Sequence, residues 1–277
     1  MRRYNYLKFL LIVLVLIFMT GCGTSNIITP SPYTVTYNGN SSTGGTVPAD
    51  ANNYEQGDNV TVLGNTGNLV KIQDGISLLF TGWNTVDNGS GTSYDAAATL
   101  TMGSANLTLY AQWSVIGGTG PAGGLIFYVK EDGYSDGWRY LEAAPRDWPQ
   151  SVEWGCYMPG TEISGADDIA VGTGKQNTID IEAECTHPGT AAYICANLPW
   201  GGKDDWFLPS KDELNLMYIN LKVSGLGSFS GYSPYYWSSS EYSKYPAGNA
   251  WLQYFGNGGQ LEDLKFNSLR VRAVRAF

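Results

Sequence analysis

Short segments rich in β-branched and aromatic residues, separated by turns, are the feature that most limits how the first part of this chain can fold. They occupy residues 33–37, 59–63, 78–83 and 107–113. Runs of this kind favour strands, and the asparagine and glycine residues beside them favour turns. No stretch in this part repeats apolar residues with a helical period over three turns. The sequence therefore predicts a small, mostly β domain over residues 33–113.

Four motifs in this domain are similar to those of a known family. They are, in order, residues 33–38 (YTVTYN), 80–83 (FTGW), 91–94 (GTSY) and 109–113 (LYAQW). Together they resemble the Listeria–Bacteroides repeat, also called the internalin-type B-repeat. The resemblance implies a β-grasp-like module of bacterial surface proteins, which acts as a spacer or an interaction unit without catalytic residues.

A glycine-rich joint and a second domain are expected after the first. Residues 114–120 (SVIGGTG) have the composition of a short, flexible linker. Ser210 and Glu213 match a capping box, which predicts a helix from Ser210 to about Leu221. The remaining pattern over residues 121–277 predicts strands at 124–129, 138–144, 235–239, 250–255 and 270–277, and short helices at 177–185 and 189–197. The expected fold class is mostly β, with an α+β second domain.

The second domain also resembles a known family along nearly its whole length. The matching segments are residues 123–128 (GGLIFY), 172–178 (GTGKQNT), 206–214 (WFLPSKDEL), 236–241 (YWSSSE) and 270–275 (RVRAVR). They resemble the bacterial domain of unknown function at the C-terminus of the Legionella collagen-like adhesin. The resemblance implies an irregular, C-type-lectin-like α+β fold that works as an extracellular binding module.

The N-terminus has the pattern of an export signal. Residues 1–8 are basic and polar, and residues 9–18 form an unbroken apolar run that is shorter than the ~20 residues needed to span a bilayer. Residues 19–22 (MTGC) resemble the lipobox of bacterial lipoproteins, which implies a signal peptide at 1–21 and acylation of Cys22. Residues 22–32 are then a tether. The glycine after Cys22 favours the outer membrane or cell surface.

Charge and composition exclude several functions. The formal net charge is −9, and without the first 22 residues it is −12, with 13 basic against 25 acidic residues. Such a surface repels phosphate backbones, so nucleic acid is not an expected partner. It also argues against the sulfated polysaccharide that the adhesin resemblance implies. The single histidine, His187, and the lack of a cysteine after Cys195 leave little for catalysis, so an enzyme is not expected.

The richest candidate site is aromatic. Residues 229–257 hold ten aromatic side chains, and aromatic faces pack against the C–H faces of sugar rings while polar neighbours bond the hydroxyls. The candidate ligand-binding residues are Tyr242, Tyr245, Glu241, Trp237, Trp251 and Gln253. The alternative is that Trp237 and Trp251 fill the core, whereas Tyr242 and Tyr245 lie in a loop where exposure is expected.

Calcium and disulfide bonds are the remaining expectations. Asp167, Asp168, Asp204 and Asp205 lie in loops that could supply oxygen ligands, but no spacing matches a calcium-binding loop, so no cofactor is expected. Outside the cytoplasm cysteines form bridges, and Cys185–Cys195 is the expected pair, with Cys156–Cys185 as the alternative.

These expectations combine into a lipid-anchored surface protein that binds noncovalently. Adhesion to a carbohydrate or a host surface is the first hypothesis. The alternative is a structural protein of the cell envelope that contacts other envelope proteins.

Overall fold

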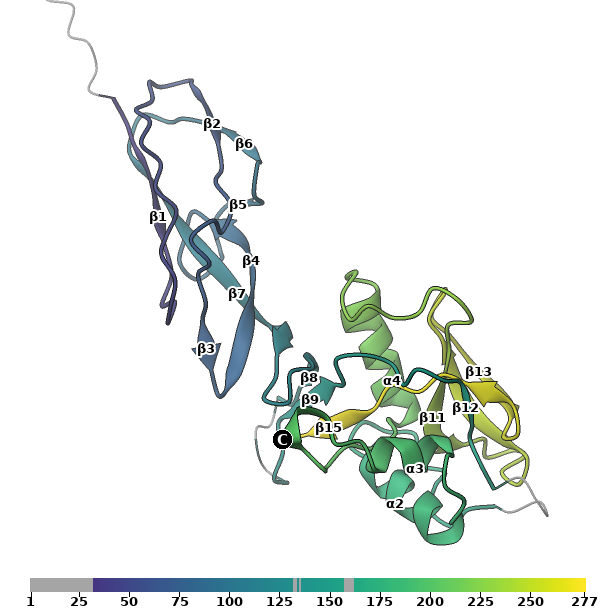
Figure 1. The fold of residues 1–277 in the computed structure, drawn as a ribbon. Coiled ribbons are helices and arrows are strands. Elements are labelled where there is room, and N and C mark those ends of the chain that lie inside the picture. Colours follow the sequence, from purple (N-terminus) through teal and green to yellow (C-terminus); the bar gives the residue numbers. More distant parts are fainter. Residues whose placement is uncertain (1–31, 132–133, 135, 157–161) are drawn as a thin grey trace, which may run out of the picture.

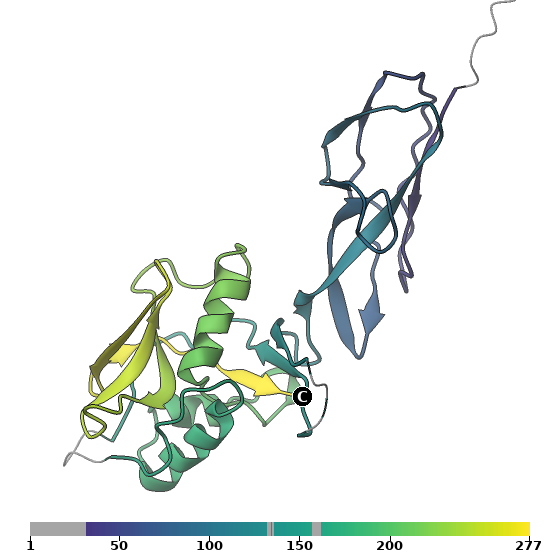
Figure 2. The same ribbon diagram turned by 180° about the vertical axis from the view of Figure 1, so that it is seen from behind.

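The computed structural model describes residues 32–131, 134, 136–156 and 162–277. The predicted signal peptide, Cys22 and the tether up to residue 31 therefore lie outside the described residues. The described part is mostly β with few helices, which confirms the predicted fold class. Figure 1 shows an elongated first unit that leads into a broader second unit, and Figure 2 shows the same arrangement from behind.

The first unit is built from seven strands. They are β1 (Val35–Asn38), β2 (Asn59–Thr61), β3 (Ile72–Gln73), β4 (Ile76–Asn84), β5 (Ser93–Tyr94), β6 (Thr99–Thr101) and β7 (Leu107–Thr119). Strands β1 and β7 are parallel neighbours, β4 is antiparallel to β7, and β2 pairs with β6. All four strand segments expected from the sequence are present. The short strands β3, β5 and β6 were not expected, because two or three residues carry too little pattern.

Trp83 forms the centre of the first core. Its ring is fully buried, lies 4.7 Å from the ring of Tyr37, and donates its Nε1–H to the carbonyl oxygen of Leu63 at 2.8 Å. The hydroxyl of Tyr37 accepts the backbone N–H of the same Leu63 at 2.8 Å. Two aromatic side chains on different strands thus hold one loop residue by both of its backbone groups.

The expected linker at residues 114–120 is not a flexible joint, and this prediction is wrong. Strand β7 continues to Thr119, pairs Ser114 with Leu79 of β4, and pairs Thr119 with Leu125 of the next unit. One sheet therefore runs through both units in the order β15-β9-β8-β7-β4-β3. The β-branched residues Val115 and Ile116 explain the difference, since they pack against the buried side chains of Ile76, Leu78, Ile126 and Tyr140.

The second unit surrounds two further cores. Its strands are β8 (Leu125–Val129), β9 (Tyr140–Ala143), β10 (Val152–Glu153), β11 (Tyr235–Glu241), β12 (Asn249–Tyr254), β13 (Gly259–Leu264), β14 (Ser268–Leu269) and β15 (Val274–Ala276). Its helices are α2 (Gly174–Glu184), α3 (Ala191–Ala196), α4 (Lys211–Met217) and the short turns η1 (Trp200–Gly202) and η2 (Tyr218–Lys222). Strands β8, β9 and β15 extend the long sheet, and β11, β12 and β13 form a separate antiparallel sheet. The predicted pairing of residues 124–129 with 138–144 is confirmed.

The end of the chain is held by buried arginines. Arg272 donates to Asp147 Oδ1 at 2.7 Å, and Arg275 contacts both Glu142 at 3.1 Å and Asp205 at 2.8 Å. Burying a charge is costly unless it is paired, and each guanidinium here is paired. The side chain of Asp205, which the sequence had suggested as a calcium ligand, therefore serves as an ion-pair partner.

Candidate functional site

Four side chains meet on the surface of the second unit and form what we call the aromatic cluster: Lys211, Tyr242, Tyr245 and Trp251. The ring of Tyr242 lies 5.0 Å from that of Trp251 in an edge-to-face arrangement and 6.2 Å from that of Tyr245. The ammonium of Lys211 lies 4.5 Å from the centre of the Trp251 ring. Tyr245 is 67% exposed, while Tyr242 and Trp251 are partly buried. The loop after β11 thus supplies two of the predicted tyrosines to the same surface as Trp251.

Helix α4 positions the cation of this cluster. Ser210 accepts the backbone N–H of Glu213, and the Glu213 carboxylate accepts the backbone N–H of Ser210 at 2.8 Å, which confirms the predicted capping box. The first helical residue is Lys211, whose N–H donates to the hydroxyl of Ser240 at 3.1 Å. The carbonyl oxygen of Lys211 accepts the side-chain amide of Gln260 at 3.2 Å. The backbone of Lys211 is therefore fixed from both sides.

Polar groups border the aromatic cluster. Glu262 on β13 is the direct cross-strand neighbour of Trp251, and the carboxylate of Asp212 lies 4.0 Å from the ammonium of Lys211. An aromatic face with carboxylate and ammonium neighbours can pack against the apolar face of a sugar ring and bond its hydroxyls.

Three of the predicted ligand residues lie elsewhere, and for them the prediction is wrong. Trp237, Gln253 and Glu241 are all buried. The indole of Trp237 donates to the carbonyl oxygen of Val152 at 3.0 Å. The side-chain amide of Gln253 donates to the carbonyl oxygen of Gly258 at 2.8 Å. Nearly every residue of β11 is buried, so both of its faces are covered. Alternation along a strand assigns side chains to two faces, but it does not show which face other elements cover. In β11 both faces are covered.

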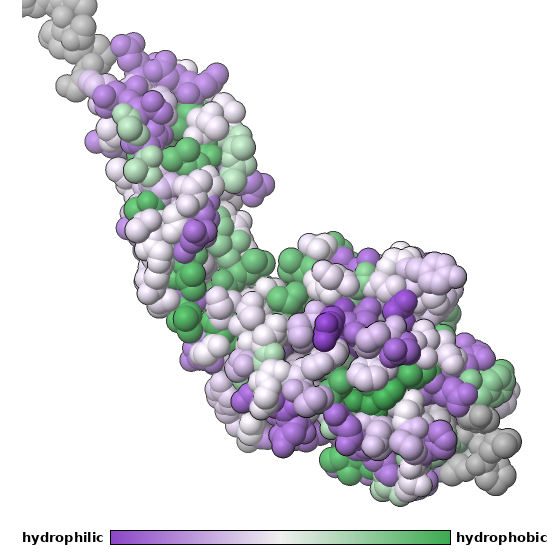
Figure 3. Space-filling view, in the orientation of Figure 1, coloured by the Kyte–Doolittle hydropathy of each residue, from purple (hydrophilic) through white to green (hydrophobic). Residues whose placement is uncertain are grey.

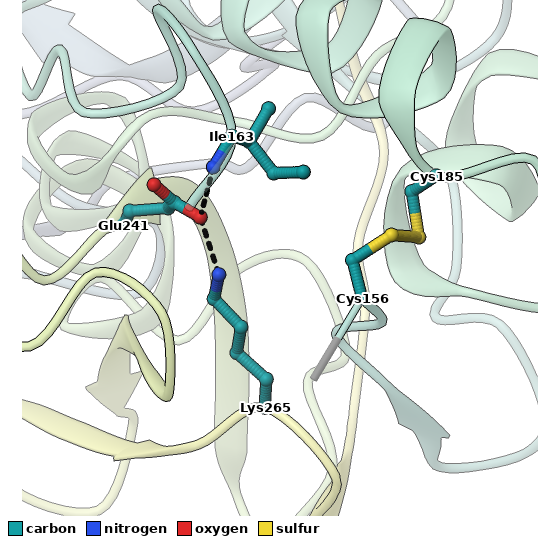
Figure 4. Close-up of a disulfide and its surroundings, with 5 residues drawn as sticks. All are labelled: Cys156, Ile163, Cys185, Glu241 and Lys265. Atoms are coloured by element: carbon teal, nitrogen blue, oxygen red, sulfur yellow. Dashed lines mark hydrogen bonds and ion pairs between the residues drawn. A yellow bond between two sulfur atoms is a disulfide. The ribbon is translucent and has the colours of Figure 1, made fainter. Parts of the chain in front are cut away.

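Glu241 forms a buried contact with Lys265 (Figure 4). Lys265 Nζ contacts Oε1 of Glu241, which also accepts the backbone N–H of Ile163 at 3.0 Å. Both side chains are completely buried, and Nζ lies 4.4 Å from the ring centre of Trp154. Burial raises the pKa of Glu241 and lowers the pKa of Lys265. Sequence reasoning did not find this pair, because its members lie 24 positions apart and only the folded sheet brings them together.

Glu213 is a second buried carboxyl group with a shifted pKa. Burial raises its pKa to about 7, although the N–H groups of Ser210 and Gly172, each 2.8 Å from a carboxylate oxygen, oppose the shift. Glu213 serves to stabilise the start of α4. It does not contact a ligand, because its side chain is fully buried.

The disulfide bond joins Cys156 to Cys185, so the expected Cys185–Cys195 bridge is wrong and the alternative is present. Cys195 is a free, buried thiol, and burial raises its pKa. A hollow of about 310 Å³ lies beside the bridge, with Glu153 and the exposed His187 on its wall. Cys195 lies in α3, whose inner face turns this thiol into the core among Ala, Ile and Trp side chains.

A second hollow of about 470 Å³ lies between α3 and the segment 148–152, which leads into β10. Trp148 and Val152 form one wall, and Tyr193, Ile194 and Leu198 form the other. Figure 3 shows the face that carries α3, where hydrophobic residues gather in a band bordered by hydrophilic ones. Sequence reasoning missed this groove, because its two walls are more than forty residues apart in the chain.

The described residues contain neither a cluster of metal ligands nor a membrane-spanning helix. Within residues 32–131, 134, 136–156 and 162–277, no three histidine, cysteine or acidic side chains come together as metal ligands. The same part of the chain holds no helix with the length and apolar character needed to cross a bilayer.

Comparison with known proteins identifies the first unit. Residues 33–112 match the model of the Listeria–Bacteroides repeat domain, which confirms the predicted repeat. Domains of this class generally belong to extracellular surface proteins. No curated protein matches the chain.

Proposed function

We propose that this protein is a lipid-anchored surface protein whose second unit binds carbohydrate noncovalently through the aromatic cluster. The observation that carries the proposal is the pairing of Tyr242 and Tyr245 at the surface beside Trp251, with the ammonium of Lys211 above the indole. Aromatic side chains of this kind are usually buried, so a group of them at the surface indicates a binding site.

The repeat domain supports a location outside the cell. Residues 33–112 belong to a class that generally occurs on bacterial surfaces. Acylation of Cys22 would anchor the chain, with the first unit as a spacer between the membrane and the second unit. Labelling with a clickable fatty acid tests this part: the wild type should be labelled and a Cys22→Ala variant should not.

Binding is best tested on a glycan array with residues 33–277. The two units share one sheet, so they should be kept together. A variant carrying both Tyr242→Ala and Tyr245→Ala should lose binding. The control is Tyr232→Ala, since this tyrosine is 84% exposed and lies outside the cluster.

A third variant tests whether the ligand binds at the aromatic cluster or in the groove between α3 and residues 148–152. Tyr193→Ala removes one aromatic side chain from the wall of the groove and leaves the cluster intact. Binding that survives the double tyrosine variant but is lost in Tyr193→Ala would move the site to the groove. If the wild type binds no glycan, with or without calcium, the alternative of a structural envelope protein is favoured.

A further inference from the structure

Glu241 and Lys265 form an arrangement that charge pairing does not fully explain. Glu241 is the last residue of β11, and Lys265 follows directly after β13, so the pair bridges the two outer strands of one sheet. Both side chains are completely shielded from solvent. Taking two opposite charges out of water costs more than their attraction returns unless further groups satisfy them. Oε2 of Glu241 has no hydrogen-bond partner among the described residues.

Burial works against the charged form of each group, although the contact between them opposes this effect. Burial raises the pKa of the Glu241 carboxyl and lowers the pKa of the Lys265 amine. A proton that moves from Nζ to the carboxyl group converts the pair into a neutral acid and a neutral amine. A neutral lysine amine carries a lone pair and is a nucleophile, and the carboxyl carbon next to it is an electrophile.

We propose that Glu241 and Lys265 condense into an intramolecular isopeptide bond. The lone pair of Nζ attacks Cδ of Glu241, which forms the C–N bond and places negative charge on Oε1. The backbone N–H of Ile163 already donates to Oε1 at 3.0 Å, where it stabilises that charge. Nζ gives up a proton, Oε2 receives it, and the bond between Cδ and Oε2 breaks to release one water molecule. Atoms and charges balance, and no oxidant or cofactor is needed.

Glu162 is the residue to which we assign the proton transfer. Its negative charge raises the pKa of both Glu241 and Lys265. It precedes Ile163, the residue that holds Oε1, so one short segment supplies both the proton carrier and the oxyanion donor.

Two physical effects drive the condensation. Groups held in contact react with effective concentrations of roughly 10⁵–10⁸ M, because the entropic part of the barrier is already paid when the protein folds. The product is also a neutral amide, so the cost of two buried charges disappears. The bond would join residues 24 positions apart and close a covalent loop around β12.

Peptide mapping of the full chain, isolated from the membranes of expressing cells, tests the proposal. Trypsin should fail to cut after Lys265, and the digest should contain a branched peptide in which a fragment with Glu241 is joined to one with Lys265. A Lys265→Arg variant cannot form the bond. After correction for the substitution, its intact mass should exceed that of the wild type by one water molecule, and any N-terminal modification cancels in this difference.

Lys211→Arg is the matched control, because it changes a lysine of the same unit that lies outside the buried pair, and it should retain the branched peptide. Linear peptides only, with cleavage after Lys265 in the wild type, would overturn the proposal. Should Lys265→Arg fail to fold, the wild-type map alone decides between the two results.

Discussion

The buried carboxyl group of Glu213 gives the sharpest prediction about stability. Its pKa is about 7 in the folded protein and 4.5 in its ordinary state. The folded state therefore binds this proton more tightly than the unfolded state does. The resulting stabilisation is complete below about pH 4.5 and is lost as the pH rises through 7.

The size of the effect follows from the two pKa values. Between pH 5 and pH 8 the linkage relation gives a loss of about 2.5 kcal/mol in the free energy of unfolding. A Glu213→Gln variant has no such proton, so its stability lacks this dependence. The stability of the wild type relative to the variant should therefore fall by about 2.5 kcal/mol over the same range.

Urea unfolding of both proteins at several pH values measures this difference. The Glu213→Gln substitution also replaces one of the two accepting oxygens with an amide nitrogen, which lowers stability by an amount that does not depend on pH. Only the pH dependence of the difference is therefore diagnostic. Asp212→Asn, which changes a neighbouring acid with an exposed side chain, is the control and should retain the wild-type dependence. A difference that is constant with pH, or that grows as the pH rises, would refute the reasoning.

Three further predictions concern the scaffold, and each is measured by denaturant unfolding. Cys156→Ser breaks the disulfide bond, which joins residues 29 positions apart, and should lower the free energy of unfolding by about 3.5 kcal/mol. Cys195→Ser is the control, because Cys195 is a free thiol, and it should leave the disulfide intact in a non-reducing peptide map. Gly117→Ala should cost about 1–3 kcal/mol, because Gly117 has a φ of 79° and an added Cβ would lie 2.7 Å from a methyl carbon of Leu226; an unchanged stability would contradict that strain. Trp83→Ala should cost about 3–5 kcal/mol through the cavity it leaves in the first core, and a loss below about 1 kcal/mol would show that the site collapses around it.

Local signals in the sequence predicted local structure well. The capping box at Ser210 needs only residues three positions apart, and it is present as expected. The strands of the first unit were found for the same reason, since alternation is visible within a single segment. Strand β13 was missed because its sequence, GQLEDL, carries two acidic residues and none of its side chains is fully buried.

Contacts between residues far apart in the sequence could not be predicted. The correct cysteine pair, Cys156–Cys185, joins distant segments, whereas Cys185–Cys195 was favoured because the two are close in sequence. The aromatic residues were located correctly, but which of them are exposed depends on the helices that cover β11. Tyr245 lies at the surface and Trp237 in the core, although both come from the same aromatic stretch.

The parallel pairing of β1 with β7 determines how the first unit responds to a mechanical pull. The chain enters β1 at the end far from the second unit and leaves β7 at the near end (Figure 1). Tension applied between the start of β1 and the second unit would draw the two strands along each other in opposite directions. All of the hydrogen bonds between the two strands are then loaded at the same time, in shear. They cannot break one after another from one end of the strand pair.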